Sequence, residues 1–198
     1  MKLYKDSPEV NLFSLLIKLL FMSKIANRII SVPSIVKIYL HKEGLTIEGP
    51  LGRNEIFFPD GLEVVNKEDK ISTKSENIAL AGTHNSLIYN AIKGVTEGYQ
   101  ETLEIKGIGY KVSLKDNKLE FLLGKSHPIL LDVPEGIEVK NEGNKITIRG
   151  INKQQVRKFA VNDIKSLRLP SVYKKSKGIY FVGEEESIKL KPRKSLNK

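Results

Sequence analysis

The sequence predicts an α+β fold made of two tandem duplicated units, each a small antiparallel sheet packed against one helix. Two observations lead to this class. The chain contains an internal repeat, and short strand-like apolar segments followed by one helical apolar pattern occur twice along its 198 residues. A chain of this length forms one large domain or two small ones, and the repeat favours two.

The repeat emerges when the chain is shifted against itself by 75 positions, which aligns residues 59–71 with residues 134–146. Seven of the thirteen aligned pairs are identical: Pro59/Pro134, Gly61/Gly136, Glu63/Glu138, Val64/Val139, Asn66/Asn141, Lys70/Lys145 and Ile71/Ile146. A period this long indicates a duplicated small domain and not a solenoid. We therefore predict an N-terminal extension at 1–21, a first α+β unit at 22–100, a second at 101–180 and a basic C-terminal tail at 181–198.

The N-terminal extension resembles neither a membrane span nor a typical targeting signal. Residues 12–22 are apolar apart from Ser14 and Lys18, and this run is too short to cross a bilayer. Residues 1–21 contain no Arg and include Asp6 and Glu9, whereas a mitochondrial presequence is rich in Arg and poor in acids. We interpret the segment as an N-terminal extension or the product of an early start codon, and we prefer this interpretation to a targeting signal.

The first unit begins with strand patterns at 35–40 and 45–47, separated by turn-forming residues and therefore predicted to form a hairpin. Further strands are predicted at 55–58, 62–65 and 71–73. A helix closes the unit, with Gly94 and Gly98 weakening its end. Its apolar residues recur at helical spacing: Leu87, Ile88, Ala91, Ile92 and Val95.

The second unit repeats this order. Its strands are predicted near residues 103–105, 110–114, 119–123, 129–133, 137–139 and 146–148. A helix follows, with Asn152 as N-cap, Gln155 as its reciprocal capping partner and Pro170 as its limit. Its apolar stripe consists of Val156, Phe159, Ala160, Ile164 and Leu167.

Charge distinguishes the two units. The chain carries a net charge of +10, and residues 145–198 alone hold fifteen Lys or Arg against four Asp or Glu. Residues 23–98 balance at nine of each sign, whereas residues 99–198 hold 21 basic and 12 acidic residues. Because like charges repel unless a polyanion neutralises them, the second unit and tail are predicted to bind nucleic acid. The neutral first unit is predicted to be a scaffold or protein-facing surface.

Composition and motifs give no support for an enzyme. The absence of Cys excludes disulfides, thiolate zinc sites and cysteine nucleophiles. Gly107 and Gly109 lack the third glycine of a dinucleotide-binding turn, and residues 124–126 lack the earlier glycine of a phosphate loop. The three histidines are scattered, with no ligand spacing that would define a metal site. No cofactor, metal, membrane or small-molecule substrate is therefore predicted.

Eight short motifs now resemble, in order, the universal large-subunit ribosomal protein six family. The resemblance covers residues 22 to about 194, and the motifs are 22–25 (MSKI), 49–52 (GPLG), 80–83 (LAGT), 93–99 (KGVTEGY), 107–110 (GIGY), 123–128 (LGKSHP), 134–137 (PEGI) and 150–154 (GINKQ). The resemblance implies two tandem α+β units and a role in large-subunit assembly. It also implies contacts of the C-terminal unit with large-subunit rRNA near the translation-factor site, neighbouring ribosomal proteins as partners, and no catalysis.

The sequence departs from this family's pattern after Pro170. The segment 170–178 carries one extra residue between Tyr173 and Gly178, so the register of its lysines on phosphates cannot be transferred from the family. The following residues 179–191 are more similar to mitochondrial members. We therefore favour the ribosome of the mitochondrial matrix, with the bacterial cytoplasm and the plastid stroma as alternatives.

Most of the candidate RNA-binding residues are cations and polar groups of the second helix and of the tail. Others lie in the segment just beyond Pro170 that contains Lys174, Lys175 and Lys177, which we call the strap and expect to extend along backbone phosphates. Between residues 145 and 177 the only acid is Asp163, so these cations lack local partners. Tyr173 has two interpretations, stacking on a base or packing in the core, and Lys125 lies either in an RNA-contacting loop or in a plain hairpin turn. The full set is Lys125, Lys153, Gln154, Arg157, Lys158, Lys165, Arg168, Tyr173, Lys174, Lys175, Lys177, Lys189, Lys191, Arg193 and Lys194. The alternative function is a free regulatory module that binds RNA away from the ribosome.

Overall fold

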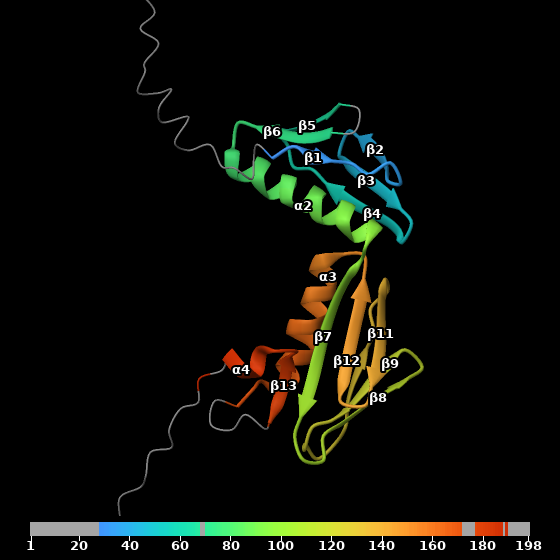
Figure 1. Ribbon diagram of the computed structural model, residues 1–198, viewed down its shortest axis with the longest axis vertical. Helices are drawn as coiled ribbons and strands as arrows, with labels where there is room; N and C mark the ends of the chain where they lie inside the picture. Colours follow the sequence, from blue (N-terminus) through green and yellow to red (C-terminus); the bar gives the residue numbers. More distant parts are fainter. Residues whose placement is uncertain (1–27, 68–69, 172–176, 188, 190–198) are drawn as a thin grey trace, which may run out of the picture. The chain divides into compact units, whose positions relative to one another are not determined.

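The computed structural model describes residues 28–67, 70–171, 177–187 and 189, and it confirms the predicted α+β class (Figure 1). The chain divides into two compact units, each of which is described by itself. Of the described residues, the first unit takes those within 28–46 and 55–89, and the second takes 47–54 and those from 90 to 189. The turn at residues 50–51 and the end of the first long helix therefore belong to the second unit.

The first half of the chain contains six strands and one helix. These are β1 (Ile30–Ser31), β2 (Lys37–His41), β3 (Gly44–Gly49), β4 (Gly52–Phe57), β5 (Leu62–Lys67), β6 (Lys70–Ser75) and α2 (Ile78–Thr96). The strands form two sheets of order β1-β6-β5 and β2-β3-β4, and the predicted β2–β3 hairpin is confirmed. Helix α2 runs along one face of these strands (Figure 1) and buries the predicted residues Ile88, Ala91, Ile92 and Val95.

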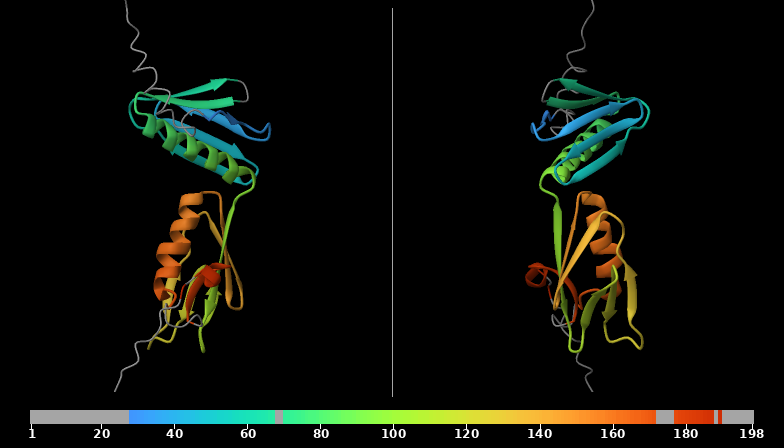
Figure 2. Two further views of the ribbon diagram at one scale, coloured as in Figure 1. Left: turned by 60° about the vertical axis from the view of Figure 1, so that its left-hand side comes forward. Right: turned by 90° about the vertical axis from the view of Figure 1, so that its right-hand side faces the viewer.

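The second half repeats this arrangement with additional elements at its end. The strands are β7 (Tyr99–Lys106), β8 (Lys111–Lys115), β9 (Lys118–Leu122), β10 (Ile129–Asp132), β11 (Ile137–Glu142), β12 (Lys145–Gly150) and β13 (Gly178–Phe181). The helical segments are α3 (Lys153–Lys158), the π-helix η1 (Phe159–Ile164), the 3₁₀-helix η2 (Lys165–Arg168) and α4 (Glu184–Ser187). The two sheets have the orders β10-β9-β8 and β11-β12-β7-β13, and Figure 2 shows α3 beside the larger one.

The structure confirms the duplication at the level of individual residues. Strands β5 and β6 and strands β11 and β12 begin and end at positions that differ by 75, and helices α2 and α3 begin at positions that also differ by 75. Each hairpin follows a glycine with positive φ, +83° at Gly61 and +78° at Gly136. Asn77 and Asn152 then start the two helices in the same way, because each Oδ1 accepts a hydrogen bond from the backbone N–H two residues later, at 3.0 and 2.9 Å.

One detail of the predicted capping is wrong. Asn152 is the N-cap, and its Oδ1 accepts hydrogen bonds from the backbone N–H groups of Gln154 and Gln155. The Gln155 side chain does not reach back to it. Instead, Gln155 Nε2 donates to the carbonyl of Glu135 at 2.9 Å, which fastens the start of α3 to the loop before β11.

Two strands escape the sequence pattern. Strand β1 has two residues and pairs Ile30 with Ile71 of β6. Strand β13 adds a fourth strand at the edge of β7, with Ile179 opposite Ile105. Strand β1 is too short for a periodic pattern, and periodicity alone cannot assign the apolar run at 179–182 to a strand or a helix. The attachment of β13 brings the start of the C-terminal segment onto the second unit.

The predicted second helix consists of α3, η1 and η2, which follow one another without a break but differ in the type of helical turn. The predicted apolar stripe is confirmed, since Val156, Phe159, Ala160 and Ile164 are buried. A shift of 75 positions would align Ile88 of α2 with Asp163, yet the buried residue is Ile164. The π turn over Phe159–Ile164 accommodates this one extra residue, as π-helical turns commonly do.

A single core holds the second unit together. Sixteen buried residues from both sheets and the helix form one apolar cluster, including Leu103 of β7, Phe121 of β9, Ile146 of β12 and Phe159 of the helix. Because the helix and both sheets share this cluster, the polar side of the helix has a fixed direction toward solvent. Among the described residues, no helix is long and apolar enough to cross a membrane.

We expect Phe159→Ala to lower the free energy of unfolding by about 3–5 kcal/mol, because the ring is 2% exposed and its loss leaves a cavity. Urea denaturation followed by circular dichroism measures this change. Leu130→Ala is the matched control, since that side chain is 65% exposed and should shift stability by less than about 0.5 kcal/mol. Equal stabilities for the two variants would contradict the packing of the π turn.

Candidate nucleic-acid interface

The second helix presents its cations on the side opposite the core. Lys153, Lys158 and Arg168 are exposed, whereas the residues between them that carry the apolar stripe are buried. Gln154 is exposed as well. The predicted separation of a buried stripe from a basic face is therefore present, and this face is open to an RNA phosphate backbone.

Two of the predicted cations have acidic partners that the sequence did not indicate. An Arg157 guanidinium nitrogen lies 3.0 Å from a carboxylate oxygen of Glu101 on β7, and Lys165 forms an ion pair with Glu184. Both cations also lie over the ring of Phe181, at 4.3 and 4.9 Å from its centroid. These partners come from segments distant in sequence, so a search for acids near the helix misses them.

Glu184 joins the C-terminal segment to the helix. One carboxylate oxygen accepts a hydrogen bond from the Lys165 ammonium. The other accepts a hydrogen bond from the Phe181 backbone N–H at 2.9 Å. Burial raises the pKa of Glu184, but the hydrogen bonds from Lys165 and Phe181 and the charges of Lys165 and Arg157 outweigh it and hold the pKa below its ordinary value. We call Arg157, Lys165, Phe181 and Glu184 the latch.

Lys153 lies at the start of α3 and has local contacts. Its Nζ donates to Asn90 Oδ1 at 3.4 Å and lies 5.7 Å from the centroid of the Tyr99 ring. Neither contact neutralises its charge. Lys153 therefore has no acidic partner among the described residues and lies exposed at the start of the helix.

Among the predicted site residues that the structure describes, six are exposed and form no ion pair with a described residue: Lys125, Lys153, Lys158, Arg168, Lys177 and Lys189. Lys177 precedes β13, and its carbonyl accepts hydrogen bonds from the Ser171 backbone N–H at 3.1 Å and the Tyr180 hydroxyl at 3.2 Å. The predicted site residues Tyr173, Lys174, Lys175, Lys191, Arg193 and Lys194 lie outside the described residues.

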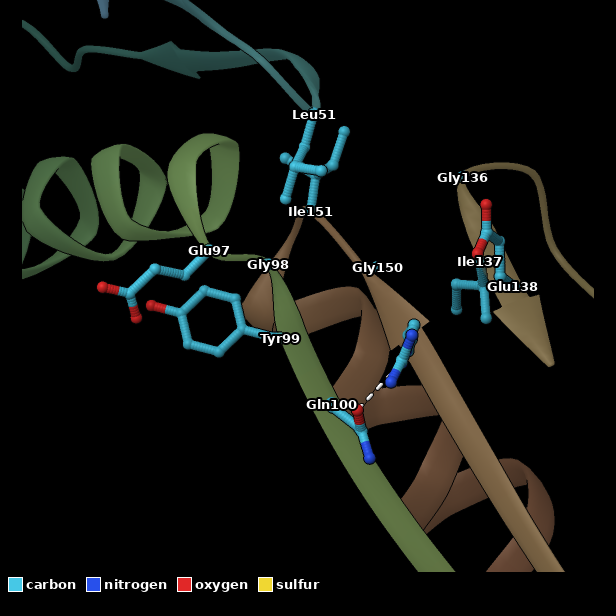
Figure 3. A pocket seen from close by; sticks show the side chains of 11 residues that line it. Leu51, Glu97, Gly98, Tyr99, Gln100, Gly136, Ile137, Glu138, Gly150 and Ile151 are labelled. Atoms are coloured by element: carbon cyan, nitrogen blue, oxygen red, sulfur yellow. Dashed lines mark hydrogen bonds between the residues drawn. The ribbon is translucent and has the colours of Figure 1, made fainter. Parts of the chain in front are cut away.

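A separate hollow of about 700 Å³ lies where β7 begins and β12 ends (Figure 3). Its lining includes Tyr99 and Gln100 of β7, Glu138 of β11, and Arg149, whose Nε donates to Gln100 Oε1 at 2.8 Å. Glu97 also lines it. With carboxylates in its wall and none of the predicted RNA-binding residues, this hollow does not fit a polyanion.

The histidines do not gather at a site. His84 Nδ1 lies 3.1 Å from the Leu80 carbonyl oxygen and its ring meets Phe58 edge to face, while His41 and His127 are exposed. Over the ranges that the structure describes, no three His, Cys, Asp or Glu side chains are grouped as a metal site would require.

Comparison with known proteins finds a matching family profile and several similar sequences. The profile of a family described as Ribosomal protein L6 matches residues 106–180. The chain is 42% identical to the large ribosomal subunit protein uL6 of Mycoplasmoides gallisepticum over 172 residues, covering 83% of this chain and 93% of the relative. It is 43% identical to the uL6 protein of Aquifex pyrophilus over 175 residues, with 84% and 92% covered. For the Hydrogenobaculum sp. protein the identity is 41% over 182 residues, with 89% and 98% covered.

The latch generates a pH-dependent prediction. Since the folded-state pKa of Glu184 is lowered, its contribution to stability should be present above its ordinary value of 4.5 and lost as the pH falls through the lower folded value. Wild type should therefore be more stable than Glu184→Gln at pH 7, and the difference should shrink toward pH 3. Urea denaturation across this range measures it.

The matched control is Glu135→Gln, which changes an exposed carboxylate outside the latch. This variant should track wild type across the same range. A stability gap between wild type and Glu184→Gln that stays constant down to pH 3 would show that the carboxylate charge does not hold the latch.

Proposed function

The chain belongs to the ribosomal protein L6 family, and on that basis we propose that it binds large-subunit rRNA through its second unit and C-terminal tail. As a member of this family it is a structural constituent of the large ribosomal subunit and not an enzyme. The observation that carries the proposal is the set of exposed cations at Lys158, Arg168 and Lys177, which have no acidic partner among the described residues.

The binding mode that fits these residues is recognition of the RNA backbone. A-form RNA hides its base edges in a deep narrow groove and presents phosphates and ribose hydroxyls, so a protein reads it mainly by shape and charge. Lysines and an arginine spread over a helix face match such a surface. As the family resemblance implies, we place the contact near the translation-factor site and assign the protein a role in subunit assembly.

The cations of the helix have different roles in this proposal. The Arg157 side chain remains 54% exposed although it pairs with Glu101, so it can contact a phosphate while paired. The Lys165 side chain is only 15% exposed and its ammonium is already bound to Glu184. We assign Lys165 to the latch, where it supports RNA binding by fixing the start of the basic tail.

The first unit has the character of a protein-facing surface. Its charges balance, and it exposes large apolar side chains that include Tyr39, Leu40 and Phe57, the last with 76% of its surface accessible. Apolar exposure without a charge excess favours a protein partner over RNA. We therefore propose neighbouring ribosomal proteins as the partners of this unit.

A mitochondrial location is part of this proposal and stays a prediction. It rests on the C-terminal sequence that follows Gly178, whereas the relatives named above are bacterial. Co-purification of tagged protein with mitochondrial ribosomes from the source cells would establish it, and recovery with another ribosome would replace it.

Sedimentation tests the assignment to the ribosome. Tagged protein from its source cells, run through sucrose gradients at moderate and then high salt, should migrate with the large subunit and remain there at high salt. Retention is expected because an integral protein combines phosphate contacts with protein contacts that salt does not screen. Migration only in light fractions would favour the free RNA-binding module.

Substitutions in the strap test whether its positive charges contribute to RNA binding. Replacing Lys174, Lys175 and Lys177 together with Ala should weaken binding to protein-free rRNA and reduce the slope of log affinity against log salt by about two to three units, since each phosphate contact contributes 0.7–0.9 of a unit. Filter binding at several salt concentrations measures both effects.

The matched control removes the same charge from the neutral unit by replacing Lys37, Lys42 and Lys74, all of which are exposed. That variant should keep the wild-type slope. Equal losses in both triple variants would show that net charge alone governs binding, and an unchanged slope in the strap variant would remove the strap from the interface.

A further inference from the structure

We propose that Ile108 is an apolar wedge that packs into the minor groove of the rRNA at one end of the second unit, an inference that rests on the proposed rRNA-binding function. Ile108 is 97% exposed, more than any other large apolar side chain in the ranges that the structure describes. A single exposed isoleucine is ordinary on a protein surface. Ile108 differs because a glycine-flanked turn holds it in place and lysines lie around it.

Ile108 lies in the turn between β7 and β8. Gly109 adopts a φ of +76°, which a residue with a side chain rarely adopts, and the Tyr110 backbone N–H donates to the Gly107 carbonyl at 3.2 Å. The turn thus holds Ile108 between two glycines, two residues after the end of β7. No neighbouring side chain covers it.

A buried tyrosine ring supports this turn and a second loop together. Tyr110 is 8% exposed, and a Cβ added at Gly107 would lie 2.4 Å from its ring. A Cβ added at Gly124, in the loop between β9 and β10, would lie 3.2 Å from the same ring. Both loops therefore approach the ring as closely as glycine permits. We call residues 106–111 and 123–128 the tip.

The tip is basic. It contains three lysines and no Asp or Glu. Lys106 pairs with Glu104 at 3.5 Å, whereas Lys111 and Lys125 are exposed and form no ion pair with any described residue. Lys111 lies opposite Leu122 in the β8–β9 pairing, and Leu122 is the last residue of β9 before the second loop. The cations thus accompany the isoleucine on both loops.

This combination matches the shape and charge of an RNA helix. The minor groove of A-form RNA is wide and shallow, with ribose and base surfaces on its floor and phosphates along both edges. An apolar side chain on a rigid turn fits the floor, and flanking lysines fit the edges. Proteins that bind the DNA minor groove also use apolar side chains there, which insert between base steps. A protein partner would instead favour several apolar side chains together, which the two loops do not present.

The test uses the full chain and protein-free large-subunit rRNA from its own ribosomes. Ile108→Ala should weaken affinity by about tenfold, because it removes most of the apolar surface of the side chain. It should leave the salt slope unchanged, because the side chain neutralises no phosphate. Lys125→Ala, by contrast, should lower the slope by about 0.7–0.9 of a unit. Unfolding of Ile108→Ala should match wild type, since the residue is 97% exposed.

The matched control is Leu130→Ala, which removes an exposed apolar side chain from β10 outside the tip and should retain wild-type affinity. Wild-type affinity in Ile108→Ala would overturn the wedge while leaving the proposed function intact, provided that the strap variant still loses binding. Loss of a neighbouring ribosomal protein from large subunits carrying Ile108→Ala, with rRNA affinity unchanged, would overturn it in favour of a protein contact. Failure of the wild-type chain to bind rRNA would refute the proposed function itself.

Discussion

The pairing of β7 with its two neighbours is the interaction on which the second unit depends. One edge of β7 pairs with β12 over six residues from Tyr99 to Glu104, and the other edge pairs with β13. The first pairing joins β7 to the duplicated hairpin, as β1 pairs with β6 in the first half. The second pairing attaches a segment that has no counterpart in the first half. A strand bonded on both edges therefore connects the inherited core with the basic end of the chain.

The positive charge of the second unit serves two purposes. Part of it lies inside the unit's own contacts, where Arg157 and Lys165 meet Glu101, Glu184 and the Phe181 ring. The remainder is on the surface without acidic partners. The Lys165–Glu184 pair, with side chains 15% and 28% exposed, should be weakened less by salt than the Arg157–Glu101 pair, whose side chains are 54% and 32% exposed. The latch can therefore persist at a salt concentration that weakens phosphate contacts.

Local signals in the sequence were sufficient for most of the fold. The duplicated hairpin and helix starts follow from Gly61, Gly136 and Asn152, because turns and caps demand particular residue types at particular positions. The reciprocal role of Gln155 was wrong because a carbonyl contributed by another loop competed for its amide. Strand β13 and the partners of the helix cations were missed because they depend on contacts between distant segments. For the candidate site, the basic helix face was predictable from the stripe, whereas the latch was not.

The π turn lets the two copies of the unit differ in length without losing their shape. One additional residue in an α-helix would rotate every later side chain by about 100° about the axis. Here the wider turn at Phe159–Ile164 absorbs the residue, so the helix returns to the core at Ile164 and Lys165 follows at the position where it meets Glu184. A duplicated gene is free to accumulate an insertion at such a point, because the change is confined to one turn. The second copy could thereby acquire a new edge strand and a new partner while its ancestral core stayed in place.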